Sequence, residues 1–357
     1  MVERGAHTLS EIMSQPSVWE STLDAFPPQF PALKELWSAR DFDRVVFSGC
    51  GSTYYLAMMG ASLFQTLTGT PAQAHPASEI VLLPEVVFIP NADTLLITVS
   101  RSGETTETIE AARVFKKKTG NPVVVVTCYE ESTLAQEGDI VFATEAAQEQ
   151  SLAQTRSFSS MTIVVEAIAN LLAGKKDDYG QLHLLIPTVQ RLLNDYHDLA
   201  RQLGETQAIE RFFFLGSGPL YGIANEAMLK MKEMSLSYSE AFHVLEFRHG
   251  PMSMVDETAL VVGLISENAC HQEAAVLRQM REQGAQILAM SEEDYGLDLA
   301  SWSHFVHLRS GLPQWARPVV YLPVLQLLAY YRAMSRGQNP DQPANLFAVI
   351  SLDDLGA

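Results

Sequence analysis

A turn rich in serine and threonine carries the most informative chemistry in this sequence. It follows the aliphatic run 94–97 and precedes residues 109–115, whose apolar positions have helical spacing, so a strand-to-helix turn is predicted. Such a turn offers unpaired backbone N–H groups and the positive end of a helix, and the hydroxyls of Ser100, Ser102 and Thr105 add donors. These features are typical of a phosphate site. Alternatively, Ser102 or Thr105 only caps the helix.

A second turn of the same kind occurs earlier in the chain. The sequence Gly49-Cys50-Gly51-Ser52-Thr53 follows the apolar run 45–47 and precedes an amphipathic stretch. Gly-x-Gly after a strand also suits dinucleotide folds, but Tyr54 stands where the third glycine would be, and the sequence has no Gly-Lys-Ser/Thr of a nucleotide P-loop. We therefore predict that the two turns converge on one phosphomonoester. Gly51, Ser52 and Thr53 are the candidate ligands of this turn.

A set of charged residues further along the chain could move protons. Residues 226–234 have helical spacing, and Glu226, Lys230 and Glu233 share one side because they are four and then three residues apart. A solvated charged face is one interpretation. The titratable residues that follow favour a chemical role, in which a partly buried carboxylate acts as a base beside C1 and C2 of a sugar. His249 could then open the sugar ring, although a structural histidine in a tight turn fits equally well.

The elements that must position these residues alternate between strand and helix, and the alternation occurs twice. Each copy begins with a strand, a Gly-x-Gly turn and a helix, at Val46 to Tyr54 and again at Phe212 to Tyr221. The pattern predicts an α/β protein with two tandem doubly wound parallel sheets of flavodoxin-like type, each an α/β/α sandwich. The predicted strands of the first copy are 45–47, 72–75, 95–99, 123–127 and 140–143, and those of the second are 212–215, 259–266, 286–290 and 304–308.

The predicted domains follow from this repeat. A helical N-terminal arm covers residues 1–30, the first domain 31–190, the second domain 200–338, and a C-terminal tail that closes on the site 339–357. Residues 24–31 are rich in Pro and Phe and are predicted to form a linker. In open parallel sheets, ligands bind at the carboxyl ends of the strands where the strand order reverses, and both hydroxyl turns of the first copy fall there. The second copy has no Ser-x-Ser-Gly sequence at this place, so one phosphate site per chain is predicted.

Composition narrows the class of protein. The chain has 357 residues, of which 47% are hydrophobic, and this suffices for two domains with separate cores. The net charge of −18 argues against binding to nucleic acid or to an anionic membrane. Three widely spaced cysteines suggest neither a disulfide framework nor a zinc site. No apolar run is long enough to span a membrane, so we predict a cytoplasmic protein. No metal or cofactor is predicted.

Five motifs in fixed order resemble those of double sugar-isomerase (SIS) domain proteins. Among these are the isomerase half of glutamine:fructose-6-phosphate aminotransferase, the glucosamine-6-phosphate deaminases and the fructosyl-amino-acid phosphate deglycases. The similarity covers almost the whole chain, including Glu11-Ile12 and Gln15-Pro16 at the start and 339–346 near the end. The five motifs are 49–53, 100–105, 153–158, 229–233 and 246–251.

The resemblance implies a role for each matching residue. Glu233 would shuttle the proton between C1 and C2 with Lys230 close by, Gln154 would lie along the sugar, and His249 would open the ring. Since the family's histidine reaches the site of the neighbouring subunit, a homodimer is implied. Arg101 stands where many relatives have Gln. The sugar phosphate would be held by Ser52, Thr53, Ser100, Arg101, Ser102 and Thr105.

One departure from the family bears on the reaction. Ala348 occupies the place of the tail lysine that can form an imine with the ketose in the aminotransferase. No amidotransferase domain precedes Met1, so the chain is not expected to hydrolyse glutamine. We therefore expect an isomerase or deaminase that acts on a 6-phosphorylated amino sugar or fructosyl-amine and releases ammonia or an amine. The alternatives are a sugar-phosphate sensor without turnover and a simple aldose/ketose phosphate isomerase.

Overall fold

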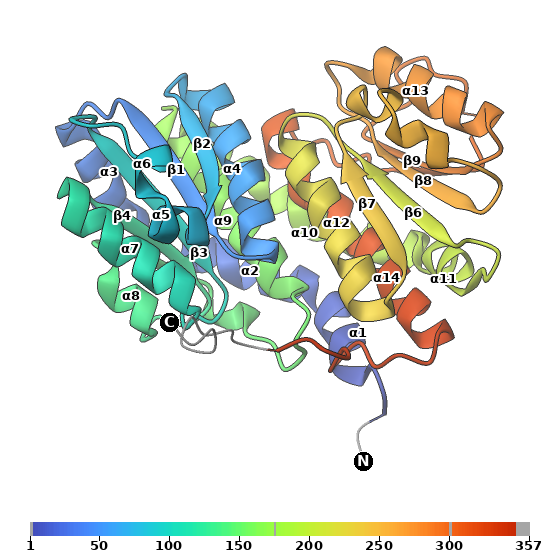
Figure 1. Cartoon of the computed structure of the whole chain (residues 1–357), viewed down its shortest axis with the longest axis horizontal. Coiled ribbons are helices and arrows are strands. Elements are labelled where there is room, and N and C mark those ends of the chain that lie inside the picture. The colour runs from blue at the N-terminus through green and yellow to red at the C-terminus, as the bar shows by residue number, and fades with distance from the viewer. Residues whose placement is uncertain (1–2, 175, 300–301, 348–357) are drawn as a thin grey trace. The chain divides into compact units, whose positions relative to one another are not determined.

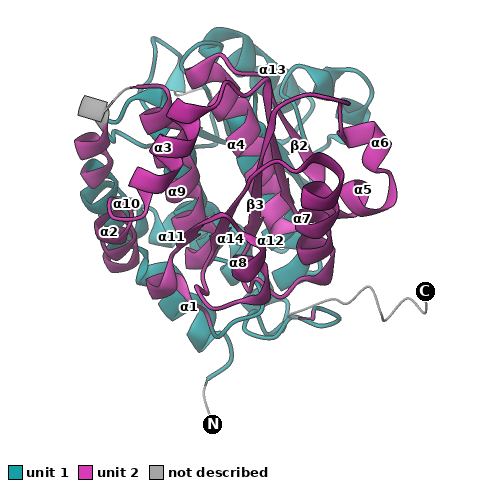
Figure 2. Ribbon diagram, turned by 90° about the vertical axis from the view of Figure 1, so that its left-hand side faces the viewer, with its two compact units in different colours: residues 1–16, 150–155, 184–346 teal, residues 17–149, 156–183, 347–357 magenta. Residues whose placement is uncertain are grey.

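The structure, a computed structural model, describes residues 3–174, 176–299 and 302–347, and these form two compact units. Within the described residues, unit 1 holds 3–16, 150–155 and 184–346, and unit 2 holds 17–149, 156–183 and 347. Figure 1 shows the course of the chain, and Figure 2 shows helix α1 in the colour of unit 1 but α2 in that of unit 2. The two units are therefore not simply successive halves of the chain.

Unit 2 is built on a five-stranded parallel sheet in the order β2-β1-β3-β4-β5. Its strands are β1 (Arg44–Gly49), β2 (Ala72–Pro76), β3 (Thr94–Ser100), β4 (Val123–Thr127) and β5 (Ile140–Ala143). Its helices are α2 (Gln15–Ala25), α3 (Phe30–Ala39), α4 (Ser52–Thr68), α5 (Ala77–Leu82), α6 (Pro84–Val87), α7 (Thr106–Thr119), α8 (Thr133–Glu137) and α9 (Arg156–Leu172), with 3-10 helices η1 (Glu145–Ala147) and η2 (Lys176–Leu184).

Both faces of this sheet are covered, because successive side chains of a strand point to opposite faces. Val46 of β1 belongs to a buried cluster with Ile80 of α5 and Phe115 of α7. The next residue, Phe47, packs instead against Phe64 of α4, with ring centroids 5.8 Å apart. Helices α5 and α7 therefore cover one face, and α4 covers the other.

Unit 1 repeats the arrangement, with its sheet in the order β10-β9-β8-β6-β7. Read from the other edge, this is the order of the first sheet with β6 in the place of β1. The strands are β6 (Arg211–Leu215), β7 (Tyr238–Phe242), β8 (Ala259–Leu264), β9 (Gln286–Ser291) and β10 (His304–His307). The helices are α1 (Ala6–Met13), α10 (Leu185–Asp195), α11 (His197–Glu205), α12 (Pro219–Ser235), α13 (Cys270–Glu282) and α14 (Leu322–Ser335), with 3-10 helices η3 (Glu246–Arg248), η4 (Pro251–Met254), η6 (Gln314–Ala316) and η7 (Pro318–Tyr321).

The repeat extends to the backbone of the Gly-x-Gly turns. Gly51, before α4, has φ 55° and ψ −124°, and Gly218, before α12, has φ 56° and ψ −129°. An L-residue with a side chain rarely adopts this conformation, so glycine is required at both places. The predicted fold class, two tandem doubly wound parallel sheets, is confirmed.

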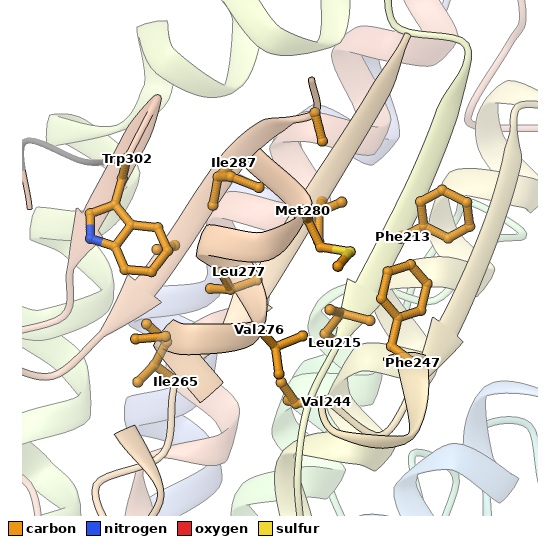
Figure 3. Packing of buried hydrophobic residues seen from close by; sticks show 14 of the residues in the cluster. Phe213, Leu215, Val244, Phe247, Ile265, Val276, Leu277, Met280, Ile287 and Trp302 are labelled. Carbon is orange, nitrogen blue, oxygen red and sulfur yellow. The ribbon is translucent and has the colours of Figure 1, made fainter. Parts of the chain in front are cut away.

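A buried apolar cluster fills one face of the unit 1 sheet (Figure 3). Phe213 and Leu215 of β6 and Leu277 and Met280 of α13 are all at most 1% exposed. Phe247 of η3 also lies in this cluster, with its ring centroid 5.2 Å from that of Phe213. The short segment that carries His249 is therefore anchored in the core of unit 1.

Two local predictions were wrong. The linker predicted at 24–31 is only a short connection, since α2 runs to Ala25 and α3 begins at Phe30. The rings of Phe26 and Phe30 are buried and stack with their centroids 5.7 Å apart. Residues 238–242 were not recognised as a strand, although they form β7 at the edge of the unit 1 sheet. An edge strand buries only part of its surface, so its sequence lacks a strong apolar signal.

The helices that the structure describes are short compared with a membrane span. The longest α-helices of the described chain, α4, α9 and α12, have 17 residues each. Among the residues that the structure describes, no helix is both long and apolar enough to cross a membrane.

Arg332 of α14 is expected to contribute strongly to the stability of unit 1. The side chain is 2% exposed and donates to the carbonyl oxygens of Thr206 (2.9 Å) and Ile209 (2.6 Å) and to Ser237 Oγ (3.2 Å). Arg332→Met removes all three hydrogen bonds, including the one to the buried carbonyl of Ile209, and should lower the free energy of unfolding by about 2–4 kcal/mol. The exposed Arg336 provides the control, Arg336→Met. Equal urea midpoints for the two variants would contradict this role.

Candidate functional site

The order of the unit 2 sheet reverses at β1 and β3, and both hydroxyl turns lie at this point. The two strands are neighbours, with Ser48 paired to Thr98 near their carboxyl ends, while β2 and β4 extend the sheet in opposite directions. Helices α4 and α7, which follow the two strands, cover opposite faces of the sheet, and such a reversal opens a crevice for ligands. Cys50 Sγ of the first turn lies 3.6 Å from Thr108 Oγ1 of α7, so the turns are close together.

The turn after β3 presents hydroxyl groups that are oriented by the backbone. Ser100 Oγ accepts the N–H of Gly103, and Ser102 Oγ accepts the N–H of Glu104, each at 3.1 Å. Because a hydroxyl can accept and donate at once, both protons remain able to point at an anion. Thr105 is the N-cap residue of α7, but its side chain makes no capping hydrogen bond. The capping alternative is therefore wrong for these residues.

The turn after β1 is held closed by one of its predicted ligands. Thr53 Oγ1 accepts the N–H of Cys50 at 3.0 Å and donates to the carbonyl oxygen of Cys50 at 2.9 Å. The hydroxyl of Thr53 thus maintains the turn. Ser52 is 4% exposed at the start of α4, and Gly51 is exposed at the tip of the turn.

Arg101 has a carboxylate partner that sequence inspection missed. Its Nη1 lies 3.7 Å from Oε2 of Glu149, whose side chain is fully buried. Glu149 also accepts hydrogen bonds from the backbone N–H (3.3 Å) and the hydroxyl of Ser157, near the start of α9. The carboxylate partly balances the charge of Arg101, so an anion here would depend chiefly on hydroxyl and N–H donors. Glu149 belongs to no recognisable motif, and only the fold brings it to Arg101.

The corresponding crevice of unit 1 contains a carboxylate. Glu273 of α13 is 1% exposed, and its Oε2 accepts the N–H (2.7 Å) and the hydroxyl (3.0 Å) of Ser266, which follows β8. Burial raises the pKa of Glu273, and the nearby hydroxyls of Ser217 and Ser266 oppose that rise. Ser217 holds the place in the β6 turn that Cys50 holds in the β1 turn. The donors of this crevice thus face an internal anion, which fits the prediction of one phosphate site per chain.

A charged triad on α12 is the candidate group for proton transfer. Lys230 Nζ lies 2.5 Å from Glu233 Oε2 and 3.3 Å from Glu226 Oε1. The side chains of Lys230 and Glu226 are 1% and 0% exposed, whereas that of Glu233 is 17% exposed. Lys232 is exposed, as its helical position predicts. The solvated-face interpretation is therefore wrong, and Glu233 is the most exposed member of the triad.

Charge pairing keeps the buried ammonium protonated. Burial alone would lower the pKa of Lys230, but the charges of Glu226 and Glu233 outweigh this effect and raise the pKa above its usual value. A buried lysine flanked by two carboxylates is stable only as a cation. It therefore fixes the position of the Glu233 carboxylate.

His249 and Gln154 lie in different surroundings of unit 1. His249 is exposed between η3 and η4, while Phe247 two residues earlier is fully buried (Figure 3). The His249 ring is therefore not part of the core. Gln154 lies in segment 150–155, where Ala153 and Thr155 are buried, and among the described residues its Oε1 is buried without a hydrogen-bond partner. Ala348 lies outside the described residues.

The predicted residues thus fall into two groups. Gly51, Ser52, Thr53, Ser100, Arg101, Ser102 and Thr105 belong to unit 2, and Gln154, Lys230, Glu233 and His249 belong to unit 1. Their action on one substrate stays a prediction.

The cysteines show no sign of nucleophilic or metal chemistry. All three are free thiols, and burial raises the pKa of Cys50 and, to about 12, that of Cys128, so both stay protonated near neutral pH. Within 3–174, 176–299 and 302–347, no three His, Cys, Asp or Glu side chains gather as metal ligands would.

Comparison with known proteins identifies the family. The SIS domain model matches residues 38–171 and again 207–305. The chain therefore belongs to the SIS domain family.

The relatives carry several activities. The isomerizing glutamine–fructose-6-phosphate aminotransferase of Methanothermobacter thermautotrophicus is 28% identical over 359 residues, which cover 99% of this chain but only 59% of that protein. Glucosamine-6-phosphate deaminase from Thermotoga maritima superposes with a TM-score of 0.79 at 28% identity, covering 97% of this chain and 100% of that one. Tagatose-6-phosphate ketose/aldose isomerase from Escherichia coli, at 23% identity and TM-score 0.82 with 96% of each chain covered, shares the fold.

Removal of the buried ammonium should destabilise unit 1 in a pH-dependent way. Lys230→Met leaves the buried Glu226 carboxylate without its cation, which should cost about 3–5 kcal/mol at pH 8. The unpaired carboxyl then favours its protonated form in the folded state, so the loss should shrink as the pH falls towards 5. Lys232→Met on the exposed side is the control. A loss that is the same at both pH values would contradict the pairing.

Glu273 predicts a pH effect that can be measured separately. Its folded-state pKa is raised, so the folded protein binds an extra proton between the unfolded and folded pKa values, and stability falls as the pH rises through this window. Glu273→Gln keeps an acceptor oxygen for Ser266 but does not titrate. The variant should therefore gain stability relative to the wild type between pH 5 and pH 8 in urea unfolding. For the exposed control Glu282→Gln, the difference in stability from the wild type should be the same at pH 5 and pH 8. The same result for Glu273→Gln would contradict a buried charge at Glu273.

Proposed function

We propose that this chain is a phosphosugar isomerase that acts as a deaminase on a 6-phosphorylated amino sugar or a fructosyl-amine. The two hydroxyl turns of unit 2 would bind the phosphate, Glu233 would transfer the proton between C1 and C2, and His249 would open the ring. The observation that carries the proposal is the Glu233 carboxylate, held 2.5 Å from a buried ammonium and still 17% exposed.

This geometry suits a base that must both take and return one proton. The ion pair to Lys230 restricts the rotamers of Glu233. The carboxylate would therefore be oriented before the substrate binds. Because Lys230 carries a fixed positive charge, it can also stabilise the enolate-like charge that develops when the carbon loses its proton. Arg101 and the serine hydroxyls would hold the other end of the substrate.

The reaction balances with water as the only co-reactant. In an open-chain 2-amino aldose phosphate, the proton moves from C2 to C1 and leaves an imine at C2, and water then releases ammonia and the ketose phosphate. In a fructosyl-amine, the amine is on C1. The proton moves from C1 to C2, the imine forms at C1, and water releases the amine and an aldose phosphate. One base beside both carbons serves either direction.

Two observations favour loss of an amine over transfer of one. Glucosamine-6-phosphate deaminase from Thermotoga maritima superposes on 97% of this chain at 28% identity. Ala348 offers no amine for an imine with a ketose, where the family resemblance implies a lysine. Ammonia or a substrate amine would then be the only nitrogen in the reaction.

We infer a homodimer in which His249 serves the partner's site. Four large apolar side chains of the chain segment 236–254, which includes His249, are about half exposed. An exposed apolar group of this kind is typical of a surface covered by another chain. The four are Leu236, Tyr238, Leu245 and Met254.

Glu233→Gln provides the test of the reaction. Loss of the base should lower turnover by about 10²–10⁴-fold, while affinity for the sugar phosphate changes little because the phosphate donors remain. Ammonia and ketose release from glucosamine 6-phosphate and amine release from fructosyl-lysine 6-phosphate are measured, with binding followed by calorimetry. The exposed Glu210→Gln is the control.

Three results would overturn the proposal. Binding of these sugar phosphates without any product would identify a sensor instead. Turnover that survives in Glu233→Gln would show that another group moves the proton, and ketose/aldose exchange without release of an amine would identify a simple isomerase.

A further inference from the structure

The segment that carries Gln154 is fixed by parts of the chain far from it in sequence. Residues 150–155 connect Glu149 to α9, both in unit 2, yet the segment itself belongs to unit 1 (Figure 2). It has no helix or strand of its own. Its backbone N–H groups must therefore find partners elsewhere, since a buried N–H without one is costly.

Glu11 of α1 supplies those partners at the start of the segment. Its Oε1 accepts the N–H of Gln150 at 2.6 Å and that of Ser151 at 3.3 Å, and its Oε2 accepts the Ser151 hydroxyl. The side chain is 3% exposed. Hydrogen bonds to a buried carboxylate are roughly twice as strong as neutral ones. One side chain thus sets the course of the chain as it enters the segment.

Asp341 joins the same α-helix to the middle of the segment. Its Oδ1 accepts the N–H and the hydroxyl of Thr8, both at 2.8 Å, and its backbone oxygen accepts the N–H of Leu152 at 2.9 Å. Helix α1 thus contacts the segment through Glu11, the segment contacts Asp341 through Leu152, and Asp341 contacts α1 through Thr8. The residue is 6% exposed. Residues near both ends of the described chain therefore meet at this segment.

Gln154 lies between two fixed points. After it, the carbonyl oxygen of Thr155 accepts Nε2 of Gln326 on α14 at 3.1 Å. The Gln154 amide oxygen between them is buried and has no hydrogen-bond partner within the part of the chain that the structure describes, which costs free energy. A hydroxyl donor, such as one from a sugar, would satisfy it.

We propose that Glu11 and Asp341 are positioning residues that hold segment 150–155 so that the Gln154 amide can bind a hydroxyl group of the sugar. The part concerning the sugar rests on the proposed function. This assigns a role to the Glu11-Ile12 and Pro340-Asp341 motifs, which carry no chemistry of their own. It also makes α1 a support for the site, although α1 has no proposed contact with the substrate.

Hydrogen exchange tests the positioning without any need for activity. In Glu11→Gln, the amides of Gln150 and Ser151 should exchange at least about tenfold faster, because a carboxamide is a weaker acceptor than a carboxylate. In Asp341→Asn, the effect should appear first at Thr8. The sheet of unit 1 should keep its protection in both, as in the control Glu20→Gln on the exposed side of α2. Unchanged exchange at 150–152 in Glu11→Gln would overturn the proposal, whether or not the chain has the proposed activity.

A double-mutant cycle tests the link to Gln154. Gln154→Ala and Glu11→Gln should each weaken glucosamine 6-phosphate binding by about tenfold, and the double variant should be no weaker than Gln154→Ala alone. Effects that multiply would show that Glu11 acts apart from Gln154 and would overturn the proposal. Ser151→Ala, which removes only one hydrogen bond to Glu11, gives a milder variant if Glu11→Gln does not fold. If no sugar phosphate binds to the wild type, the proposed function fails, and hydrogen exchange alone decides the positioning.

Discussion

The reversal of strand order in a parallel sheet is the constraint on which this molecule depends. In unit 2, β1 has β2 on one side and β3 on the other, so right-handed connections send α4 and α7 to opposite faces. Ligands of such sheets bind at this reversal. The same strand order recurs in unit 1 at β6 and β8. In unit 2, Ser100 and Ser102 accept backbone N–H groups after β3, whereas in unit 1 Glu273 accepts the N–H and hydroxyl of Ser266 after β8.

The two units share this geometry but carry different side chains on it. Helix α12 begins at a turn that matches the turn of α4, yet it carries the buried ammonium of Lys230 between Glu226 and Glu233. Unit 1 pairs its buried charges, with the N–H and hydroxyl of Ser266 on the Glu273 carboxylate and two carboxylates beside the Lys230 ammonium. In the net-acidic chain, positive charge at the candidate site is thereby confined to a few side chains with fixed partners.

Features encoded by short sequence spacing could be predicted, and those made by distant contacts could not. The strands, the Gly-x-Gly turns and the shared side of Glu226, Lys230 and Glu233 follow from periods of two and about 3.6 residues. The partners of Arg101 and of segment 150–155 depend on contacts between distant parts of the chain, such as the one across 140 residues between Glu11 and Ser151. No local pattern marks Glu149, Glu273 or Glu11 as buried carboxylates. Strand β7 was missed because its alternating polar residues were attributed to chemistry.

The number of sugar phosphate molecules bound per chain tests most directly whether the chain has a single phosphate site. Calorimetric titration of the wild type with glucosamine 6-phosphate should give one site per chain, and the variant with both Ser100→Ala and Ser102→Ala should lose most of that affinity, because an anion would lose two oriented donors. Two sites per chain, or one site whose affinity survives the loss of both hydroxyls, would contradict a single phosphate site at the reversal of the unit 2 sheet.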